Sequence, residues 1–426
     1  MRLPAPGLLR DHGYRQLFAA TAVSHLGARI TTLAIPLVAI MALDASPFEV
    51  GVLAAMSTAS FLLVGLPAGA WVDRMRRRSV LIVGDLGRAV ALATVPLAWW
   101  SGALTIWQLY AVALGSGAFT VFFDVAYQSY LPHLVGRDNL VEGNAKLESV
   151  AAVSRLAGPA VAGYLIRLLS APVALLVDAA ALALSAIFVA RIGKPEERPA
   201  RRPDAHLLRE IAEGLRFVAG HRLLRAIATC TGIFNLCYAA YSAMMILYLK
   251  RELGLDAGTI GLVFSIFGAG GLLGAFTARR IAGRVGEGQV IWMSTAFTAP
   301  FGLLLPLVAE PGWRLWVAAA AGIVFHAGIV IYNVAQVSFR QRLTPDRLLG
   351  RVNATMRFLV WGVVPIGGLA GGVLGELVGV RATLLVAMLA AATAFVPVFL
   401  SPLRTMRVLP TEPEDEAPQR APSPAG

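Results

Sequence analysis

Charged residues are scarce in this sequence of 426 residues, where Asp, Glu, Lys and Arg together make up 15%. An ordinary soluble domain carries about 25% charged residues. The apolar set of Ala, Val, Ile, Leu, Met, Phe, Trp, Tyr and Cys makes up 57%, and the mean hydropathy is +0.68. So few charges do not cover the outside of a soluble chain of this size, which excludes a soluble enzyme, a disordered protein and a fibrous protein. The composition predicts an all-α protein that crosses a membrane many times.

Cysteine and the usual enzyme motifs are almost missing as well. The two cysteines, Cys230 and Cys237, lie in one apolar segment. On a helix they would be separated by a rise of ~10 Å, too far for a disulfide, so we expect plain core thiols. The sequence has no GxxxxGK[ST] loop for ATP, no His and Cys cluster with zinc spacing and no assignable Ser-His-Asp arrangement. We therefore expect no enzyme activity, no metal and no cofactor.

Long apolar runs, in contrast, are abundant. A helix that spans the hydrocarbon of a bilayer needs about 20 apolar residues. Twelve stretches of this kind divide into two sets of six. The first set covers 17–42, 48–72, 79–100, 104–128, 149–169 and 172–190, and the second covers 224–248, 258–281, 289–309, 314–337, 355–377 and 381–402.

Lys and Arg residues are distributed unevenly between the two sides of this layout. Of the 37 in the chain, 28 lie in the termini and in the loops on the same side, and 5 lie in the opposite loops. Such an excess marks the cytoplasmic side. We therefore expect a multi-pass protein of the bacterial cell (inner) membrane with both termini in the cytoplasm. The net charge of +12 then follows from topology, and no nucleic-acid partner is expected.

One long loop separates the two sets of spans. We expect an N-terminal six-helix bundle over 1–190, a cytoplasmic linker over 191–223, a C-terminal six-helix bundle over 224–403 and a disordered cytoplasmic tail over 404–426. Within the linker, apolar residues fall on one face of a predicted helix. That helix either lies on the membrane surface or packs under the bundle. The residues of this face are Leu207, Leu208, Ile211, Leu215 and Val218.

The two halves of the chain also resemble each other in sequence. A shift of 209 residues places LVGRDNLVEGNAKLE (134–148) on LTPDRLLGRVNATMR (343–357). The same shift aligns Asn144 with Asn353, Gly158 with Gly367, and Gly163 with Gly372. Repeats of six helices in a transporter place the substrate site at the midplane, between the halves.

The loop between spans 2 and 3 reads GAWVDRMRRR over 69–78. Its glycine permits close helix approach, and its carboxylate and arginines stand at a helix end on the basic side. This order closely resembles the signature loop of the major facilitator superfamily. The resemblance implies twelve helices in two bundles and a gate that includes this loop when the protein is open outward. The gate residues are Gly69, Asp73, Arg74, Arg77 and Arg78, with Asp124 joining them.

Span 5 contains SRLAGPAVAG over 154–163, in which Pro159 leaves a carbonyl one turn back unpaired. The segment looks like the antiporter motif of exporters in that superfamily, carried here by Gly158, Pro159 and Gly163. The longer stretch 122–163 resembles the macrolide-efflux and enterobactin-exporter branch of the drug–proton antiporters. That resemblance implies export driven by proton entry. Members of the branch commonly have an acidic residue where this chain has Ala28.

Polar residues inside the predicted spans are candidates for contact with substrate or proton, because such groups are costly in hydrocarbon. The resemblance implies that spans 1, 4, 7 and 10 line the cavity. The candidates on these spans are His25, Arg29, Tyr127, Asn235, Tyr238, Tyr241, His326, Asn333 and Gln336. Asp85 and Arg88 are expected to neutralise each other. Arg155 and Asp178 are further candidates whose partners the sequence does not supply.

The proton carrier is sought among His326, His25 and Asp124. A histidine titrates near physiological pH. The positive charge of Arg29 disfavours protonation of His25, one turn away on the same helix. His326 is therefore the better candidate for the carrier. The alternative is that both histidines only form hydrogen bonds.

We therefore expect a monomeric exporter of a bulky amphipathic small molecule, such as a drug, a macrolide-like compound or a siderophore, by proton antiport. A lysophospholipid or other lipid-like substrate, an importer of a sugar or an anion, and a non-transporting sensor or scaffold are the alternatives. The partners expected are the substrate, protons and the lipid bilayer.

Overall fold

The computed structural model describes residues 7–72, 74–136, 138–194, 196, 215–344 and 346–406. These residues form helices and short connections, and no strand occurs among them. The helices of the first half are α1 (His12–Ala42), α2 (Pro47–Val72), α3 (Arg77–Trp100), α4 (Ile106–Val135), α5 (Leu140–Leu169) and α6 (Ala171–Ala190). Those of the second half are α8 (Arg222–Leu247), α9 (Ala257–Val285), α10 (Glu287–Gly302), α11 (Trp313–Leu343), α12 (Asp346–Val378), α13 (Val380–Ala392) and α14 (Val396–Phe399).

Eleven helices of the described chain are long and apolar enough to cross a membrane. The span expected at 289–309 is the exception, because α10 has 16 residues and gives way to turns after Gly302. At ~1.5 Å per residue this helix is about 24 Å long, somewhat short of the hydrocarbon thickness. The span expected at 381–402 is divided between α13 and α14. The all-α membrane fold expected from the sequence is confirmed, with α10 completing the set of twelve.

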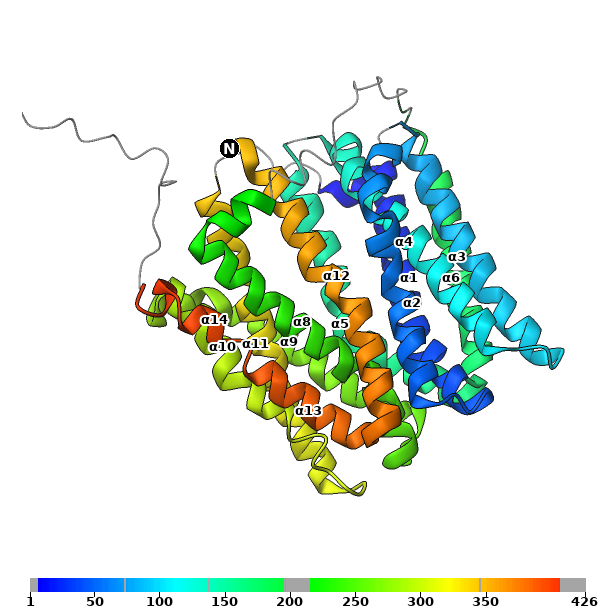
Figure 1. Cartoon of the computed structure of the whole chain (residues 1–426). Coiled ribbons are helices and arrows are strands. Elements are labelled where there is room, and N and C mark those ends of the chain that lie inside the picture. The colour runs from blue at the N-terminus through cyan, green and yellow to red at the C-terminus, as the bar shows by residue number, and fades with distance from the viewer. Residues whose placement is uncertain are drawn as a thin grey trace, which may run out of the picture.

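The helices form two groups, which Figure 1 shows with the blue-to-cyan helices on one side and the green-to-red ones on the other. Within the first group α1 packs against α5 and α6, and α3 packs against α4 and α6. Within the second, α8 packs against α12 and α13, and α11 packs against α9 and α10. Two helix pairs join the groups, α2 with α12 and α5 with α9. The molecule is thus two bundles joined mainly by these four helices, with smaller contacts of α8 with α1 and α2.

Both ends of the described chain lie at one face of the molecule, which we call the terminal face. The backbone N–H of Leu8 donates to Glu142 at the start of α5. The segment Pro402–Arg404 packs against α10, close to Gly288 at the start of that helix. The opposite end, which contains the turns at 43–46 and 253–256, is called the far face. The distribution of Lys and Arg predicts that the terminal face is cytoplasmic.

The linker is described only at its ends. Residues 215–220 are helical, and Val218 is buried against Leu223 and Leu224 of α8. Leu215 is exposed. Of the predicted amphipathic face, Leu207, Leu208 and Ile211 lie outside the described residues, as does the tail after position 406. The part of the helix that is described therefore ends packed against the second bundle.

Glycines allow the two bundles to meet in the half of the molecule next to the far face. A Cβ on Gly51 of α2 would lie 2.4 Å from Gly372 Cα of α12. A Cβ on Gly163 of α5 would lie 2.2 Å from the carbonyl oxygen of Ala257 at the start of α9. Contacts this short leave no room for a side chain, so small residues set the distance between the bundles.

Polar contacts close the rim of the far face above these glycines. Arg251 Nη2 lies 2.5 Å from Asp44 Oδ1, and Arg167 Nη1 lies 4.0 Å from Asp256 Oδ1. The backbone N–H of Phe48 donates to Glu376 Oε2 at 3.3 Å. All three contacts join one bundle to the other. Since exposed ion pairs contribute only ~0–1 kcal/mol each, we assign most of the closure to the packed glycines.

The two cysteines are free thiols, Cys230 buried and Cys237 half-buried. Both belong to α8, as the spacing in the sequence indicates. The expectation of core thiols without a disulfide is confirmed.

Candidate functional site: a cavity between the two bundles

A cavity of about 1260 Å³ lies between the two bundles. The first bundle contributes residues of α1 to α6 to its wall, and the second contributes residues of α8, α9 and α11. Packing of α2 on α12 and of α5 on α9 closes the cavity toward the far face. Toward the terminal face, the lining side chains of Glu148 and Arg155 are 70% and 49% exposed. The cavity is therefore closed at the far face and accessible from the terminal face.

Five charged residues line this cavity: Arg29, Arg88, Glu148, Arg155 and Asp178. Arg155 forms an ion pair with Glu148 along α5. Arg88 forms one with Asp85 along α3, as the sequence predicted. No carboxylate of the described chain pairs with Arg29, whose Nε is buried without a hydrogen-bond partner. Arg29 and Asp178 are thus the two wall charges that lack an ion-pair partner among the described residues.

His326 lies on the cavity wall in the middle of α11, surrounded by aromatic rings. Its ring stacks on that of Phe267 at a centroid distance of 4.6 Å, and the ring of Phe325 meets it edge-on at 5.2 Å. Nδ1 lies 2.9 Å from the carbonyl oxygen of Gly322, so this nitrogen is the donor. Nε2, 3.3 Å from the hydroxyl of Tyr238, then accepts a hydrogen bond from that hydroxyl. Both ring nitrogens of the neutral imidazole are satisfied.

Three of the nine predicted cavity residues, Arg29, Tyr238 and His326, line the cavity. The other six are placed elsewhere. Asn235 Nδ2 donates to the carbonyl oxygen of Val360, and the Tyr241 hydroxyl donates to that of Gly302. These two side chains thus tie α8 to its neighbours within the second bundle.

The remaining four predicted residues lie toward the terminal face. The Thr21 hydroxyl donates to that of Tyr127 at 3.5 Å. Asn333 is exposed, and Gln336 is buried with an unpartnered Oε1. His25 is half-buried, among the charges of Arg29, Arg155, Glu148 and Arg88.

The motif of α5 positions this helix against both α1 and α9. A Cβ on Gly158 would lie 2.5 Å from Cγ of Arg29, so the arginine stem of α1 packs directly on this glycine. Pro159 removes the donor that would bind the carbonyl oxygen of Arg155. Gly268 of α9 covers that oxygen, since a Cβ there would lie only 2.4 Å from it. Gly163 completes the contact with the start of α9. The motif therefore joins the bundles and presents Arg29 to the cavity.

The signature loop is bound to the end of its own bundle. Glu196, which follows α6, accepts the backbone N–H groups of Arg77 and Arg78 at 2.9 and 3.1 Å. A carboxylate there also complements the N-terminus of α3. The Arg78 side chain donates to the carbonyl oxygens of Val189 and Ala190. The first turn of α3 is thereby fixed to the end of α6.

The structure describes only part of the predicted gate, which therefore stays a prediction. Asp73 lies outside the described residues, and Arg74 is exposed in the turn that follows. No described atom comes within 4 Å of a Cβ built on Gly69, so the expected close approach is not made here. Asp124 is half-buried, and the charges that act on it are Arg88 and Arg357. The gate was expected in the state open to the other side, whereas here the far face is closed.

Asp73→Asn is expected to impair transport while expression stays near that of the wild type. Without the carboxylate of Asp73, the positive charge of the neighbouring arginines is uncompensated. Such a charge costs several kcal/mol when it is removed from water. Transport by cells and the amount of protein in membranes are to be measured together, with Asp138→Asn as the control. Full activity of Asp73→Asn would remove the signature loop from the mechanism.

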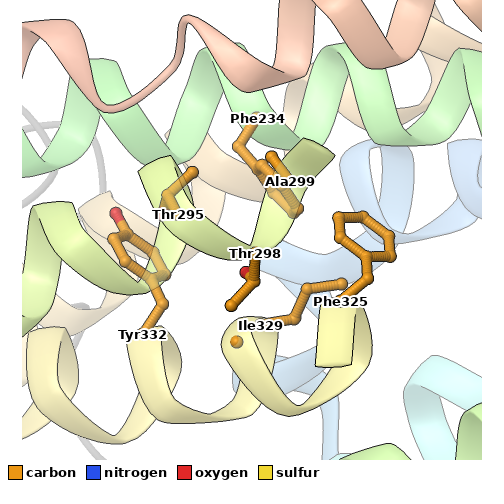
Figure 2. A pocket seen from close by; sticks show the side chains of 8 residues that line it. Phe234, Thr295, Thr298, Ala299, Phe325, Ile329 and Tyr332 are labelled. Atoms are coloured by element: carbon orange, nitrogen blue, oxygen red, sulfur yellow. The ribbon is translucent and has the colours of Figure 1, made fainter. Parts of the chain in front are cut away.

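A second, far smaller pocket lies inside the second bundle. Figure 2 shows the side chains of Phe234, Thr298, Phe325 and Tyr332 around it. Its volume is about 10 Å³, the size of one water molecule. The hydroxyl of Tyr332 lies 2.6 Å from that of Thr231 on α8. We take this pocket as a gap in the packing between α8, α10 and α11, not as a substrate site.

Two features of the site were not found from the sequence. The sequence places Glu196 in the predicted linker, but the structure shows that it reaches the start of α3. The partner of Asp178 on α6 is Thr31 of α1, whose hydroxyl donates to Asp178 Oδ2. These residues are 147 positions apart in the chain. In the sequence, the only indication of this hydrogen bond is the presence of a threonine at position 31 in an apolar span.

Comparisons with known proteins agree with this architecture. The family model described as the Major Facilitator Superfamily matches residues 17–366 and 227–425. The chain is 27% identical over 362 residues to the enterobactin exporter EntS of Escherichia coli O1:K1, covering 81% of each chain. It is 30% identical over 412 residues to the multidrug efflux pump Tap of Mycolicibacterium fortuitum, covering 92% of this chain and 96% of Tap.

Solved structures show the same fold at low identity. A bacterial homologue of the iron transporter ferroportin in its inward-facing state has a TM-score of 0.71 and 15% identity, covering 93% of this chain and 100% of that chain. The outward-facing state has a TM-score of 0.58, with 91% of this chain and 98% of that one covered. The helix arrangement described above is therefore nearer to the inward-facing one. The chain belongs to the major facilitator superfamily.

Proposed function

We propose that this chain is a secondary active exporter that moves a bulky amphipathic small molecule out of a bacterial cell by proton antiport and alternating access. The observation that carries the proposal is the cavity of about 1260 Å³, closed at the far face and accessible from the terminal face. With the terminal face in the cytoplasm, this is the state in which an exporter takes up its substrate. The relatives named as an exporter and an efflux pump support the direction of transport.

The size and lining of the cavity favour a bulky substrate. Sites for drug-sized ligands commonly measure about 300–1,000 Å³. The wall here is mostly apolar, with Phe264, Phe267 and Tyr238 among its aromatic residues and five charged residues. Aromatic and aliphatic surface binds the apolar body of a ligand, while a few polar groups fix its orientation. This mixture suits an amphipathic molecule better than a sugar, which needs many hydrogen bonds.

The proposed transport step is a relative movement of the two bundles. The four helices between them would separate near the far face and approach each other near the terminal face. Such rocking around a central site is the general scheme for transporters built from repeats. The contacts at Gly51, Gly163 and Gly372 are then interactions of one state only. Because the chain has no ATP-binding motif, we assign the driving force to a proton gradient.

His326 and Tyr238 are proposed to contact the substrate. Their hydrogen bond and the stacked ring of Phe267 place an aromatic, polar surface on the cavity wall. Since both nitrogens of His326 are already engaged, a proton could be added only if the Tyr238 hydroxyl turned to accept. We therefore assign His326 to binding, the alternative that the sequence left open, and seek the proton carrier elsewhere.

Ser242→Trp is expected to abolish the activity of the exporter, because Ser242 of α8 is exposed to the cavity and an indole there occupies substrate space. The matched control is Val90→Trp on α3, since Val90 is 67% exposed but does not line the cavity. Accumulation of a panel of fluorescent amphipathic compounds, Hoechst 33342 among them, is to be measured in an efflux-deficient host. Secretion of siderophores is to be measured in the same strains.

The expected result is lower accumulation, or higher secretion, with the wild type and with Val90→Trp but not with Ser242→Trp. Equal activity of the two Trp variants would contradict a role for the cavity. The lipid-like alternative would be favoured if the protein changed the accumulation of no compound in the panel but moved a fluorescent lysophospholipid between leaflets.

A further inference from the structure

We infer that Asp178 of α6 is the carboxyl group that takes up and releases the proton during transport. The inference rests on the proposed function, because it names the residue that would couple substrate movement to the proton gradient. It depends on where this side chain lies and on what it does and does not contact.

Two carboxyl groups lie on the wall of the cavity, those of Glu148 and Asp178. Glu148 is 70% exposed at the side chain and pairs with Arg155. Asp178 is 1% exposed, and no cation of the described chain lies within ion-pair distance of it. The wall therefore contains one carboxyl group that is both buried and unpaired.

The two oxygens of Asp178 are in different surroundings. Oδ2 accepts a hydrogen bond from the hydroxyl of Thr31 on α1. Oδ1 has no hydrogen-bond partner, and it faces the backbone of α1 so closely that a Cβ on Gly27 would lie 2.2 Å from it. An ionised carboxylate in such a place costs several kcal/mol, whereas the neutral acid costs far less. The geometry thus favours the protonated form in this state.

The charged groups near Asp178 come from one neighbouring helix. Arg88 and Asp85 of α3 both act on it. These two residues pair with each other, and Asp85 also accepts a hydrogen bond from Ser185 at 2.6 Å. The positive charge of Arg88 acts more strongly on Asp178 than the negative charge of Asp85 does. The titratable groups of α1, His25 and Arg29, are not among the charges that act on it, and α5 presents the Glu148–Arg155 pair.

Asp178 carries one proton from the far face to the terminal face in two transfers. Asp178 enters the state seen here as the acid, and its O–H proton passes to water of the cavity, which leaves as hydronium toward the terminal face. The carboxylate that remains keeps the hydrogen bond from Thr31 and the nearby positive charge of Arg88. After the bundles have rearranged, a hydronium ion from the far face gives one proton to the carboxylate and remains as water. One proton therefore moves inward through this group in each cycle.

Infrared spectroscopy tests the protonation without any substrate. Spectra of the full-length protein in lipid are to be recorded at neutral pH for the wild type, for Asp178→Asn and for Asp124→Asn. The difference between wild type and Asp178→Asn is expected to contain the C=O band of a protonated carboxyl group, shifted in D₂O. Carboxylate bands in its place would overturn the inference, whatever the chain transports.

Coupling is tested in inverted membrane vesicles with an acidic lumen and Hoechst 33342 as the probe. Asp178→Asn keeps the size of the side chain and an oxygen that can accept from Thr31, so a merely structural role would be preserved. Thr31→Val removes that hydrogen bond but keeps the carboxyl group. We expect gradient-driven uptake to fall to the level of vesicles without the protein for Asp178→Asn, and to persist for Thr31→Val.

The opposite pattern, with Asp178→Asn active and Thr31→Val inactive, would reduce Asp178 to a structural contact between α1 and α6 and overturn the inference. Gradient-driven uptake by both variants at the wild-type level would also overturn it. If the wild type does not move Hoechst 33342, the infrared result alone decides the protonation of Asp178, so failure of the proposed function remains distinguishable.

Discussion

Gly261→Val is expected to abolish transport, because a side chain at this position prevents closure of the far face. A Cβ on Gly261 of α9 would lie 2.2 Å from the carbonyl oxygen of Pro159 and 3.1 Å from Gly163 Cα. Both are backbone atoms of α5 and cannot turn away. Overpacking of this kind typically costs about 1–3 kcal/mol, and here the cost falls on one state only. An equilibrium between two states then shifts by roughly ten- to a hundredfold toward the other one.

The matched control is Gly283→Val on the same helix, where nothing lies within 4 Å of the added Cβ. Transport is to be measured together with the reaction of a cysteine at position 57, on the cavity wall, with an impermeant thiol reagent, after Cys230 and Cys237 have been replaced by serine. From the far face, Gly261→Val should increase the rate of this reaction and Gly283→Val should not. An active Gly261→Val variant with an unchanged rate would mean that α5 and α9 do not form the closure.

Asp85→Ala is expected to destabilise the first bundle more than any exposed charge substitution. Asp85 is fully buried, and it pairs with Arg88 and accepts from Ser185 of α6. The guanidinium of Arg88 also lies 4.8 Å from the ring centroid of Phe123 on α4. Removing one partner of a buried ion pair leaves the other charge uncompensated, at about 3–5 kcal/mol. Thermal unfolding of the purified protein in detergent measures the loss.

The double variant Asp85→Leu/Arg88→Met distinguishes two effects, the loss of the ion pair and the uncompensated charge that Arg88 carries in Asp85→Ala. Replacing a buried ion pair by apolar residues of similar volume is often neutral or stabilising. The double variant should therefore be more stable than Asp85→Ala. If the double variant is less stable than Asp85→Ala, the ion pair itself stabilises the packing of α3, α4 and α6, and an uncompensated charge does not explain the loss.

The fold could be predicted from the sequence because its main signals are local. An apolar run of ~20 residues specifies a membrane helix wherever it lies in the chain. The pair of Asp85 and Arg88 was also predictable, since residues three positions apart share one face of a helix. The end of α10 could not be predicted, because the apolar run continues beyond Gly302 while the chain changes from helix to turns.

The site was predictable only in part because it depends on contacts between distant helices. On a helix with a weak apolar pattern, packing decides which way a polar side chain points. Tyr238 and His326 therefore point into the cavity. The hydroxyl of Tyr241 instead donates to the carbonyl oxygen of Gly302. Asp178 acquires its importance from Thr31 and Gly27 of α1. The glycines of α9 at 261 and 268 matter because of backbone atoms of α5. None of these pairings has a local signature.

Transport against an imposed pH gradient in inverted membrane vesicles tests proton-coupled export most directly. The compound to be used is the one whose accumulation the wild-type chain lowers most in the efflux-deficient host. With an acidic lumen, the wild type should concentrate it inside the vesicles, and nigericin, which collapses the gradient, should release it. Uptake that is equal with and without the gradient, or absent in both conditions, would contradict proton-coupled export.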